Sequence, residues 1–252
     1  MGYLPLLYYR MKSIFAVRRA WRHEAKAHVK TFTFDKSKAH LSFSHEGEDR
    51  LVMRLLENKK NGFYVDIGAH HPFKYSNTAI FYDQGWRGIN IDPNPNTLTL
   101  FNAYRKSDIN VQCGVGAEGY LTYYMYKNGA INTFDDNLVK YWRDQHSIHP
   151  INSIQVTIRS LASILDQYLN DHTIDFMNID TEGFEMQVIE SNDWSRFRPR
   201  LILLESLSSA GSIQEALDTK EIQFLITKGY SVISKCLNTI ILSESKEDLR
   251  SL

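Results

Sequence analysis

The sequence predicts an α/β protein built around a mainly parallel β-sheet that carries helices on both faces. Strand-like runs and segments of helical periodicity alternate along most of the chain, which is typical of parallel sheets with helical connections. Residues 174–179 and 200–205 are rich in apolar side chains, as expected for strands that are covered on both faces. The last two strand-like runs are close enough in sequence to form an antiparallel hairpin at the edge of this sheet.

In the first half of this region, glycine and proline mark the boundaries of the elements. Residues 58–62 and Gly85 end helical stretches, and Pro95 begins one. The expected helices are residues 48–57, 77–84 and 95–105, and the expected strands are residues 62–67, 88–91 and 109–113.

In the second half, Ser160 is expected to cap a helix and Gly229 to end one. The alternation at residues 121–126 indicates a strand with one covered face. The expected helices are residues 135–142, 160–169, 184–190 and 213–228. The further expected strands are residues 121–126, 153–158, 174–179, 200–205, 230–234 and 239–242.

The composition excludes several classes of protein. Lys and Arg total 29, as do Asp and Glu, and this balance argues against a nucleic-acid binder, which normally shows a basic excess. Cys113 and Cys236 are the only cysteines, so a disulfide framework or a cysteine zinc site is not expected and a reducing, cytoplasmic setting fits. No apolar run approaches the roughly 18–20 residues of a membrane span.

Residues 1–45 differ from the expected main domain at residues 46–252. Within residues 1–30, apolar side chains recur at helical spacing and cations outnumber the single acid, Glu24. Such a basic amphipathic helix can lie on an anionic surface, which would place the protein peripherally at the inner membrane, or it can bind a partner. It can equally pack its apolar stripe on the main domain.

Three of the expected strands end in a carboxylate: Asp66, Asp92 and Asp180. The carboxyl ends of parallel strands lie along one edge of a sheet, where ligands bind in open α/β folds. We therefore expect these three acids to line one cleft. Asp92 follows the second strand, where an acid characteristically binds the hydroxyls of a ribose.

The loop after Asp66 favours a nucleoside cofactor that has no pyrophosphate. Gly68 stands alone and is followed by Ala69, His70 and His71, whereas a dinucleotide loop needs several glycines. S-adenosylmethionine is such a nucleoside. Asp66 can influence its ammonium group, and Ser76, Asn77 and Thr78 can offer hydroxyl, amide and N–H groups to its carboxylate.

Several stretches together resemble the FkbM family of methyltransferases, over roughly residues 42–243. They are FYVDIGAHHP at 63–72, SNT at 76–78, GWRGINIDP at 85–93 and IDFMNIDTEG at 174–183, with lesser matches at 44–49, 108–110 and 193–194. The resemblance implies a Rossmann-like class I fold with a seven-stranded sheet and S-adenosylmethionine as the cofactor. It also implies methylation of a hydroxyl on a sugar, glycan or natural product. Thr181 departs from the valine that the family usually has.

The resemblance also implies roles for single residues. Asp66, Gly68 and Ala69 correspond to the first cofactor motif, Asp92 to the ribose-binding acid, and Asp180 to a position near the transferred methyl group.

A general base would assist methyl transfer by taking the proton of the acceptor hydroxyl. The candidates are His70 and His71, whose residue type titrates near neutral pH and of which His70 is preferred, and the carboxylates Asp180 and Glu182. With Glu205 as a third ligand, these carboxylates could instead bind Mg²⁺, but two acids alone are too few to predict a metal site. A nicotinamide-dependent oxidoreductase and a non-catalytic scaffold are the alternative functions. The sequence does not predict the oligomeric state.

Overall fold

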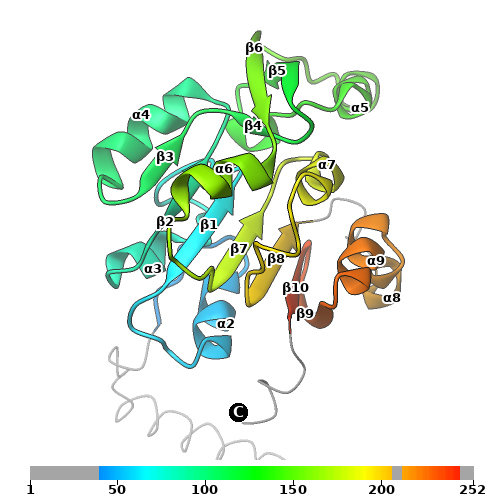
Figure 1. The fold of residues 1–252 in the computed structure, drawn as a ribbon. Helices are drawn as coiled ribbons and strands as arrows, with labels where there is room; N and C mark the ends of the chain where they lie inside the picture. Colours follow the sequence, from blue (N-terminus) through cyan, green and yellow to red (C-terminus); the bar gives the residue numbers. More distant parts are fainter. Residues whose placement is uncertain (1–39, 206–211, 245–252) are drawn as a thin grey trace, which may run out of the picture. The chain divides into compact units, whose positions relative to one another are not determined.

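The structure is a computed structural model that describes residues 40–205 and 212–244. The described residues from Ser42 onward belong to one compact unit. Its central sheet has seven strands in the order β3-β2-β1-β7-β8-β10-β9 (Figure 1). These strands are β1 Phe63–Ile67, β2 Arg87–Ile91, β3 Ile109–Val111, β7 Phe176–Ile179, β8 Leu201–Glu205, β9 Ser231–Cys236 and β10 Thr239–Ser243.

Parallel pairing joins the first five strands of this order, and antiparallel pairing joins β10 to both β8 and β9. This confirms the predicted parallel sheet and its terminal antiparallel hairpin. The helices are α2 Glu48–Leu55, α3 Ala79–Asp83, α4 Pro95–Tyr104, α5 Asp136–His146, α6 Leu161–Tyr168, α7 Glu185–Glu190, α8 Ile213–Leu217 and α9 Lys220–Thr227.

Helices cover both faces of the sheet, as predicted. Successive side chains of a strand point to opposite faces. Val65 and Ile67 of β1 therefore belong to the core that contains α6, α7 and α9 side chains, whereas Tyr64 belongs to the core that contains α2 and α3 side chains. Asp66, which shares its face with Tyr64, is the one charged residue of this strand and is buried like the others.

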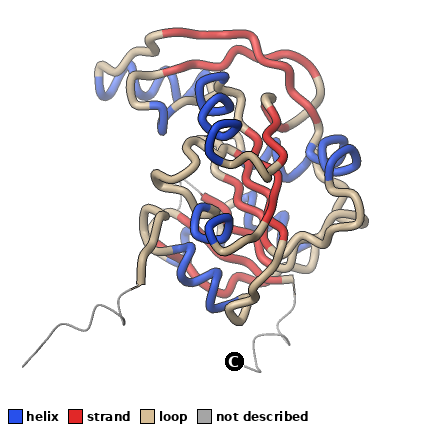
Figure 2. Tube along the Cα trace, turned by 90° about the vertical axis from the view of Figure 1, so that its left-hand side faces the viewer, coloured by secondary structure: helices blue, strands red, loops and turns tan. Residues whose placement is uncertain are grey.

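A second, three-stranded sheet was not predicted. It consists of β4 Gly114–Val115, β5 Gly119–Met125 and β6 Asn152–Arg159, in the order β4-β6-β5. The sequence indicated the two longer strands but not that they pair with each other, because α5 and its loops separate them along the chain. Both strands project beyond the central sheet at the top of Figures 1 and 2, where they lie beside the site described below.

One predicted helix is interrupted in the structure, and another lies outside the described residues. The predicted helix 213–228 is two helices, because Thr219 takes an extended conformation between α8 and α9 while the apolar periodicity continues across the break. The predicted amphipathic helix within residues 1–30 lies outside the described residues, so it and the domain boundary at residue 45 stay predictions. In the part of the chain that the structure describes, no helix has the length and hydropathy of a membrane span.

Candidate functional site

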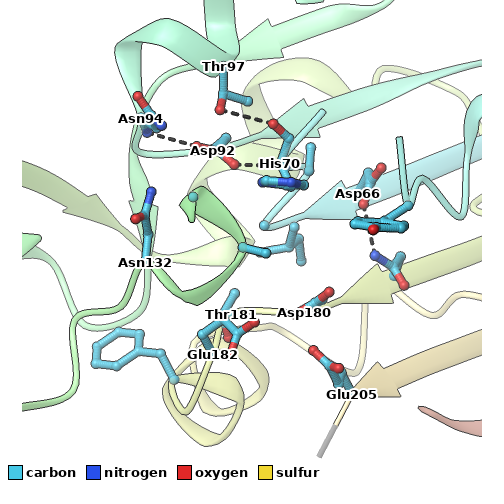
Figure 3. Close-up of a pocket in the computed structure, with 18 of the residues that line it drawn as sticks. Asp66, His70, Asp92, Asn94, Thr97, Asn132, Asp180, Thr181, Glu182 and Glu205 are labelled. Carbon is cyan, nitrogen blue, oxygen red and sulfur yellow. Dashed lines mark hydrogen bonds between the residues drawn. The ribbon is translucent and has the colours of Figure 1, made fainter. Parts of the chain in front are cut away.

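A cavity of about 520 Å³ lies at the carboxyl ends of the parallel strands (Figure 3). The three predicted acids, Asp66, Asp92 and Asp180, all line it. They come from β1, β2 and β7, which are neighbours in the sheet, so the parallel topology brings together side chains that are far apart in sequence.

Gly68 lets the ends of these strands approach one another. Its φ of +80° favours glycine, and a Cβ atom there would lie 1.6 Å from the carbonyl oxygen of Asp180. Its backbone N–H donates to Ile91 at 2.9 Å. The glycine is therefore required by the packing of three strand ends and not by a bound pyrophosphate.

Asp92 is buried, and each of its carboxylate oxygens accepts one backbone hydrogen bond. Oδ2 accepts from His70 N–H at 2.9 Å and Oδ1 from Asn94 N–H at 2.8 Å. Each oxygen therefore keeps capacity to accept a hydrogen bond from a ligand. Burial raises the Asp92 pKa to about 7, although both backbone bonds oppose the shift.

Asp66 is held from two sides. Its Oδ2 accepts from the Thr78 hydroxyl at 2.7 Å and its Oδ1 from the Asn178 amide at 2.9 Å. Asn77 in turn donates to Asn178 at 2.9 Å, and Oδ1 of Asn77 is shielded from solvent without a hydrogen-bond partner. Burial raises the Asp66 pKa.

The residues predicted to bind near the ammonium and carboxylate groups of S-adenosylmethionine thus lie at different depths. Ser76, Asn77 and Ala69 line the cavity, whereas Thr78 is fully buried and is not among the lining residues. Thr78 contacts Asp66, so it can act on a ligand only through that carboxylate. Asn178 also lines the cavity and was not identified from the sequence.

His70 lies beside Asp92 in Figure 3. Its φ of +53° turns its N–H toward Asp92, and its carbonyl oxygen accepts from the Thr97 hydroxyl at 3.0 Å. The ring lines the cavity, and burial lowers its pKa, so the imidazole is neutral at pH 7.

Asp180, Glu182 and Glu205 gather around a second part of the cavity (Figure 3). Each offers one oxygen within 4.8 Å of the other two, so the group could hold a cation. Burial and a hydrogen bond to Glu205 raise the Asp180 pKa well above its usual range. Burial, Glu205 and Glu185 raise the Glu182 pKa to about 8. The site therefore retains protons at neutral pH that ordinary carboxyl groups would lose.

The loop that carries Glu182 is shaped by Glu185, which the sequence did not single out. One oxygen of Glu185 accepts from the backbone of Thr181 at 3.0 Å, from the Thr181 hydroxyl at 3.2 Å and from the backbone of Gly183 at 3.1 Å. Glu182, between these residues, has a φ of +51°. The positive φ and the shared acceptor fix where the Glu182 carboxylate lies.

The three-stranded sheet and the segments beside it supply lining residues that sequence reasoning missed as site residues. Tyr123 and Asn132 are buried, Oδ1 of Asn132 accepts from the Tyr126 N–H at 2.8 Å, and the rings of Phe134 and Phe184 lie 5.4 Å apart. All four line the cavity. The alternation at residues 121–126 predicted a strand, but it does not reveal that this strand faces Asp92.

A buried network lies behind Asp66. Arg105, which follows α4, contacts the Tyr64 hydroxyl at 2.9 Å, and its Nη1 lies 3.6 Å from Oδ2 of Asp108. Both charged side chains are fully buried. The network connects the sheet to the loop that ends at Thr78, and the sequence offered no signal for it.

The family model described as "Methyltransferase FkbM domain" matches residues 66–232, and no curated protein matches the chain. Among solved structures, a precorrin-6y C5,15-methyltransferase from Geobacter metallireducens is 14% identical, with a TM-score of 0.41 over 83% of this chain and 94% of that chain. A methyltransferase FkbM from Methylobacillus flagellatus is 12% identical, with a TM-score of 0.43 over 84% of this chain and 47% of that chain. An O-methyltransferase from Bacillus cereus, solved with SAH, is 12% identical, with a TM-score of 0.40 over 80% and 81% of the two chains.

Proposed function

Because the chain belongs to the FkbM methyltransferase domain family, we propose that it transfers a methyl group to a hydroxyl of a sugar, glycan or natural product. Methyltransferase activity and S-adenosylmethionine as the cofactor follow from the family. The family also speaks against the alternative of a nicotinamide-dependent oxidoreductase. The observation that supports a hydroxyl acceptor is the cluster of three carboxylates, Asp180, Glu182 and Glu205, in the same cavity as Asp92, in which burial raises the pKa of Asp180 and of Glu182.

The residues at the other end of the cavity fit the cofactor. Both oxygens of Asp92 can accept from a ribose diol, since each receives only one hydrogen bond from the protein. The unpartnered Oδ1 of Asn77 is an acceptor suited to an ammonium group. When bound, the cofactor supplies a methyl group already activated by its sulfonium sulfur.

The chain's own contribution is to position the acceptor and to take its proton. Positioning alone can lower the barrier by several kcal/mol, and a general base adds about 10²–10⁴-fold in rate. We assign the base to the Asp180 and Glu182 pair, because His70 lies beside Asp92 and its backbone holds the ribose-binding acid. The mechanism that we propose uses no metal ion.

Calorimetry and a transfer assay test this function. S-adenosylmethionine should bind and NAD should not, and Asp92→Ala should weaken the binding strongly. With labelled cofactor, the product of a hydroxyl acceptor should gain one methyl group as an ether. A protein that binds the cofactor but methylates only nitrogen or carbon would refute the proposed O-methylation.

The expected setting is the cytoplasm, with a small-molecule or glycan acceptor and no nucleic acid. Peripheral contact through residues 1–30 remains a prediction that rests on their cationic, amphipathic sequence. The full chain should then sediment with anionic vesicles at low salt and less so at high salt, and a chain lacking these residues should not. Equal sedimentation of the two proteins would rule the contact out.

A further inference from the structure

The cavity continues beyond the region covered by the family model. His45, Glu46 and Thr239 line it, and they lie outside residues 66–232. Glu48, His45 and Glu205 act electrostatically on Glu46, whereas the acid that acts on Asp92 is Asp66. Glu46 therefore belongs to the Glu205 end of the cavity and not to the ribose end.

Glu46 is held in place and has unused hydrogen-bonding capacity. Its backbone N–H donates to Oε2 of Glu48 at 2.8 Å, and Oε1 of Glu48 accepts from the Thr239 hydroxyl at 3.3 Å, which ties the segment to β10. The Glu46 carboxylate interacts with the backbone of Asn238, while its Oε2 atom is shielded from solvent and has no hydrogen-bond partner. An unpartnered, shielded acceptor of this kind is costly unless a ligand donates to it.

The aromatic ring of Tyr75 lines the cavity next to His45. Tyr75 lines the cavity, is 49% exposed and lies 4.7 Å from the His45 ring, centroid to centroid. Its φ of +56° is unusual for a bulky residue, and the next residue, Ser76, donates its N–H to the carbonyl of Phe43 at 3.1 Å. Such strain clusters at ligand-binding sites, where the surrounding structure maintains it.

The acidic residues that line the cavity disfavour an anionic acceptor. The described lining residues include seven carboxylates, and Lys74 is the only lysine or arginine among them. The Nζ atom of Lys74 lies over the Tyr75 ring, 4.6 Å from its centroid. A phosphate or carboxylate on the acceptor would meet several acids and a single lysine, whereas a hydroxyl can donate to Glu46 and a ring can stack on Tyr75.

We propose that Glu46 and Tyr75 form the acceptor subsite and that it takes an uncharged, hydroxyl-rich ring in preference to an anionic one. This inference rests on the proposed function. Glu46 binds hydroxyls of the ring, Tyr75 packs against its apolar face, and the acceptor oxygen lies toward Asp180 and Glu182. Specificity thus comes from Glu46, which precedes the family domain, together with Tyr75 within it, while other residues of the domain supply the cofactor site.

The test is methyl transfer from labelled S-adenosylmethionine to glucose, galactose and mannose, each compared with its 6-phosphate and its uronate. The uncharged sugars should be methylated with a kcat/KM at least tenfold above that of their anionic partners. Glu46→Gln should raise the acceptor KM about tenfold and narrow this preference, since one charge is lost. Tyr75→Leu should raise the same KM, and Tyr75→Phe should restore it.

Glu190→Gln and Tyr120→Leu are the matched controls, because both residues are exposed and neither lines the cavity. They should leave the acceptor KM unchanged, and all variants should bind the cofactor as the wild type does. A preference for the anionic sugars, or an unchanged KM in Glu46→Gln and Tyr75→Leu, would overturn the subsite but leave O-methylation intact. If the cofactor binds and no sugar is methylated, a sugar acceptor is refuted along with the subsite.

Discussion

Two nitrogen atoms of Arg105 donate to one carbonyl oxygen, that of Pro72, at 3.1 Å from Nε and 2.6 Å from Nη2. Nη2 also donates to the Ser76 hydroxyl at 3.2 Å, and Nη1 to the Tyr64 hydroxyl at 2.9 Å. One buried guanidinium thus fastens both ends of the loop between the His70 turn and α3 to the central sheet. Because this loop carries Asn77 and Tyr75, Arg105 is a positioning residue for the cavity.

Arg105→Lys should weaken cofactor binding about tenfold, equivalent to ~1.4 kcal/mol, with a smaller change in kcat at saturation. Lysine keeps a charge opposite Asp108 but cannot donate in the planar, five-donor pattern of a guanidinium. Calorimetry and steady-state kinetics measure the two effects. Arg196→Lys, at an exposed arginine that contacts Asp166, is the control. Equal cofactor affinity in both variants would contradict the positioning role.

Gly68→Ala should abolish cofactor binding and destabilise the protein by more than Gly85→Ala does. Both glycines have positive φ, but a Cβ at Gly68 would lie 1.6 Å from the carbonyl oxygen of Asp180, whereas no atom lies within 4 Å of a Cβ at Gly85. Gly85→Ala therefore carries only the backbone cost, about 1–2 kcal/mol. Urea unfolding of the two variants separates conformational strain from the clash. Equal free energies of unfolding would mean that the strands separate readily.

The site residues that could be predicted from the sequence are those set by local pattern. Asp66, Asp92 and Asp180 each end a recognisable strand, and a parallel sheet places such ends along one edge. Arg105 could not be predicted, because its partners Pro72 and Tyr64 are distant in sequence and a buried arginine leaves no periodic signal.

The same reasoning explains what was missed in the fold. The pairing of β5 with β6 spans α5, so neither strand indicates its partner, and Tyr123 could not be assigned to the cavity. The break between α8 and α9 was missed because Thr219 interrupts the backbone without interrupting the apolar stripe. Local sequence patterns therefore do not predict which distant strands pair or where a single residue leaves the helical conformation.

Glu182→Gln should lower kcat by about 10²–10⁴-fold and remove the rise of kcat with pH that a general base produces. In the wild type the rate should climb as the carboxyl loses its proton and level off above its pKa of about 8. Asp180→Asn should affect the same rise of kcat with pH, since the two acids lie together and burial raises both pKa values.

His70→Gln tests the alternative base. If the carboxylates take the proton, kcat of this variant still rises with pH. The variant keeps the backbone N–H that donates to Asp92, so any loss of cofactor affinity comes from the imidazole that lines the cavity. If the rise of kcat with pH disappears in His70→Gln and persists in Glu182→Gln, the histidine is the general base.

Asp92→Asn should make the stability of the ligand-free protein less dependent on pH while impairing its function. Burial raises the Asp92 pKa from 3.8 to about 7, so the folded state holds this proton more tightly than the unfolded state. The stability it contributes is present at acidic pH and is lost as pH rises through 7, at roughly 1.4 kcal/mol per pKa unit. Asparagine has no charge to desolvate, so the free energy of unfolding of this variant should vary less with pH across this range. Relative to the wild type, it should be highest above neutral pH.

Cofactor binding should show the opposite trend. The ribose hydroxyls need acceptors, so wild-type affinity should fall as pH drops below the Asp92 pKa of about 7 and the carboxylate is protonated. Asp92→Asn should bind about 10–100-fold more weakly and without this pH dependence, since a hydrogen bond to a charged group is worth about 1.5–3 kcal/mol. Calorimetry one pH unit above and below that pKa measures this, with the exposed Asp171→Asn as the control. An Asp92→Asn protein that retains wild-type affinity would show that the acid is not the ribose-binding residue, whatever its effect on stability.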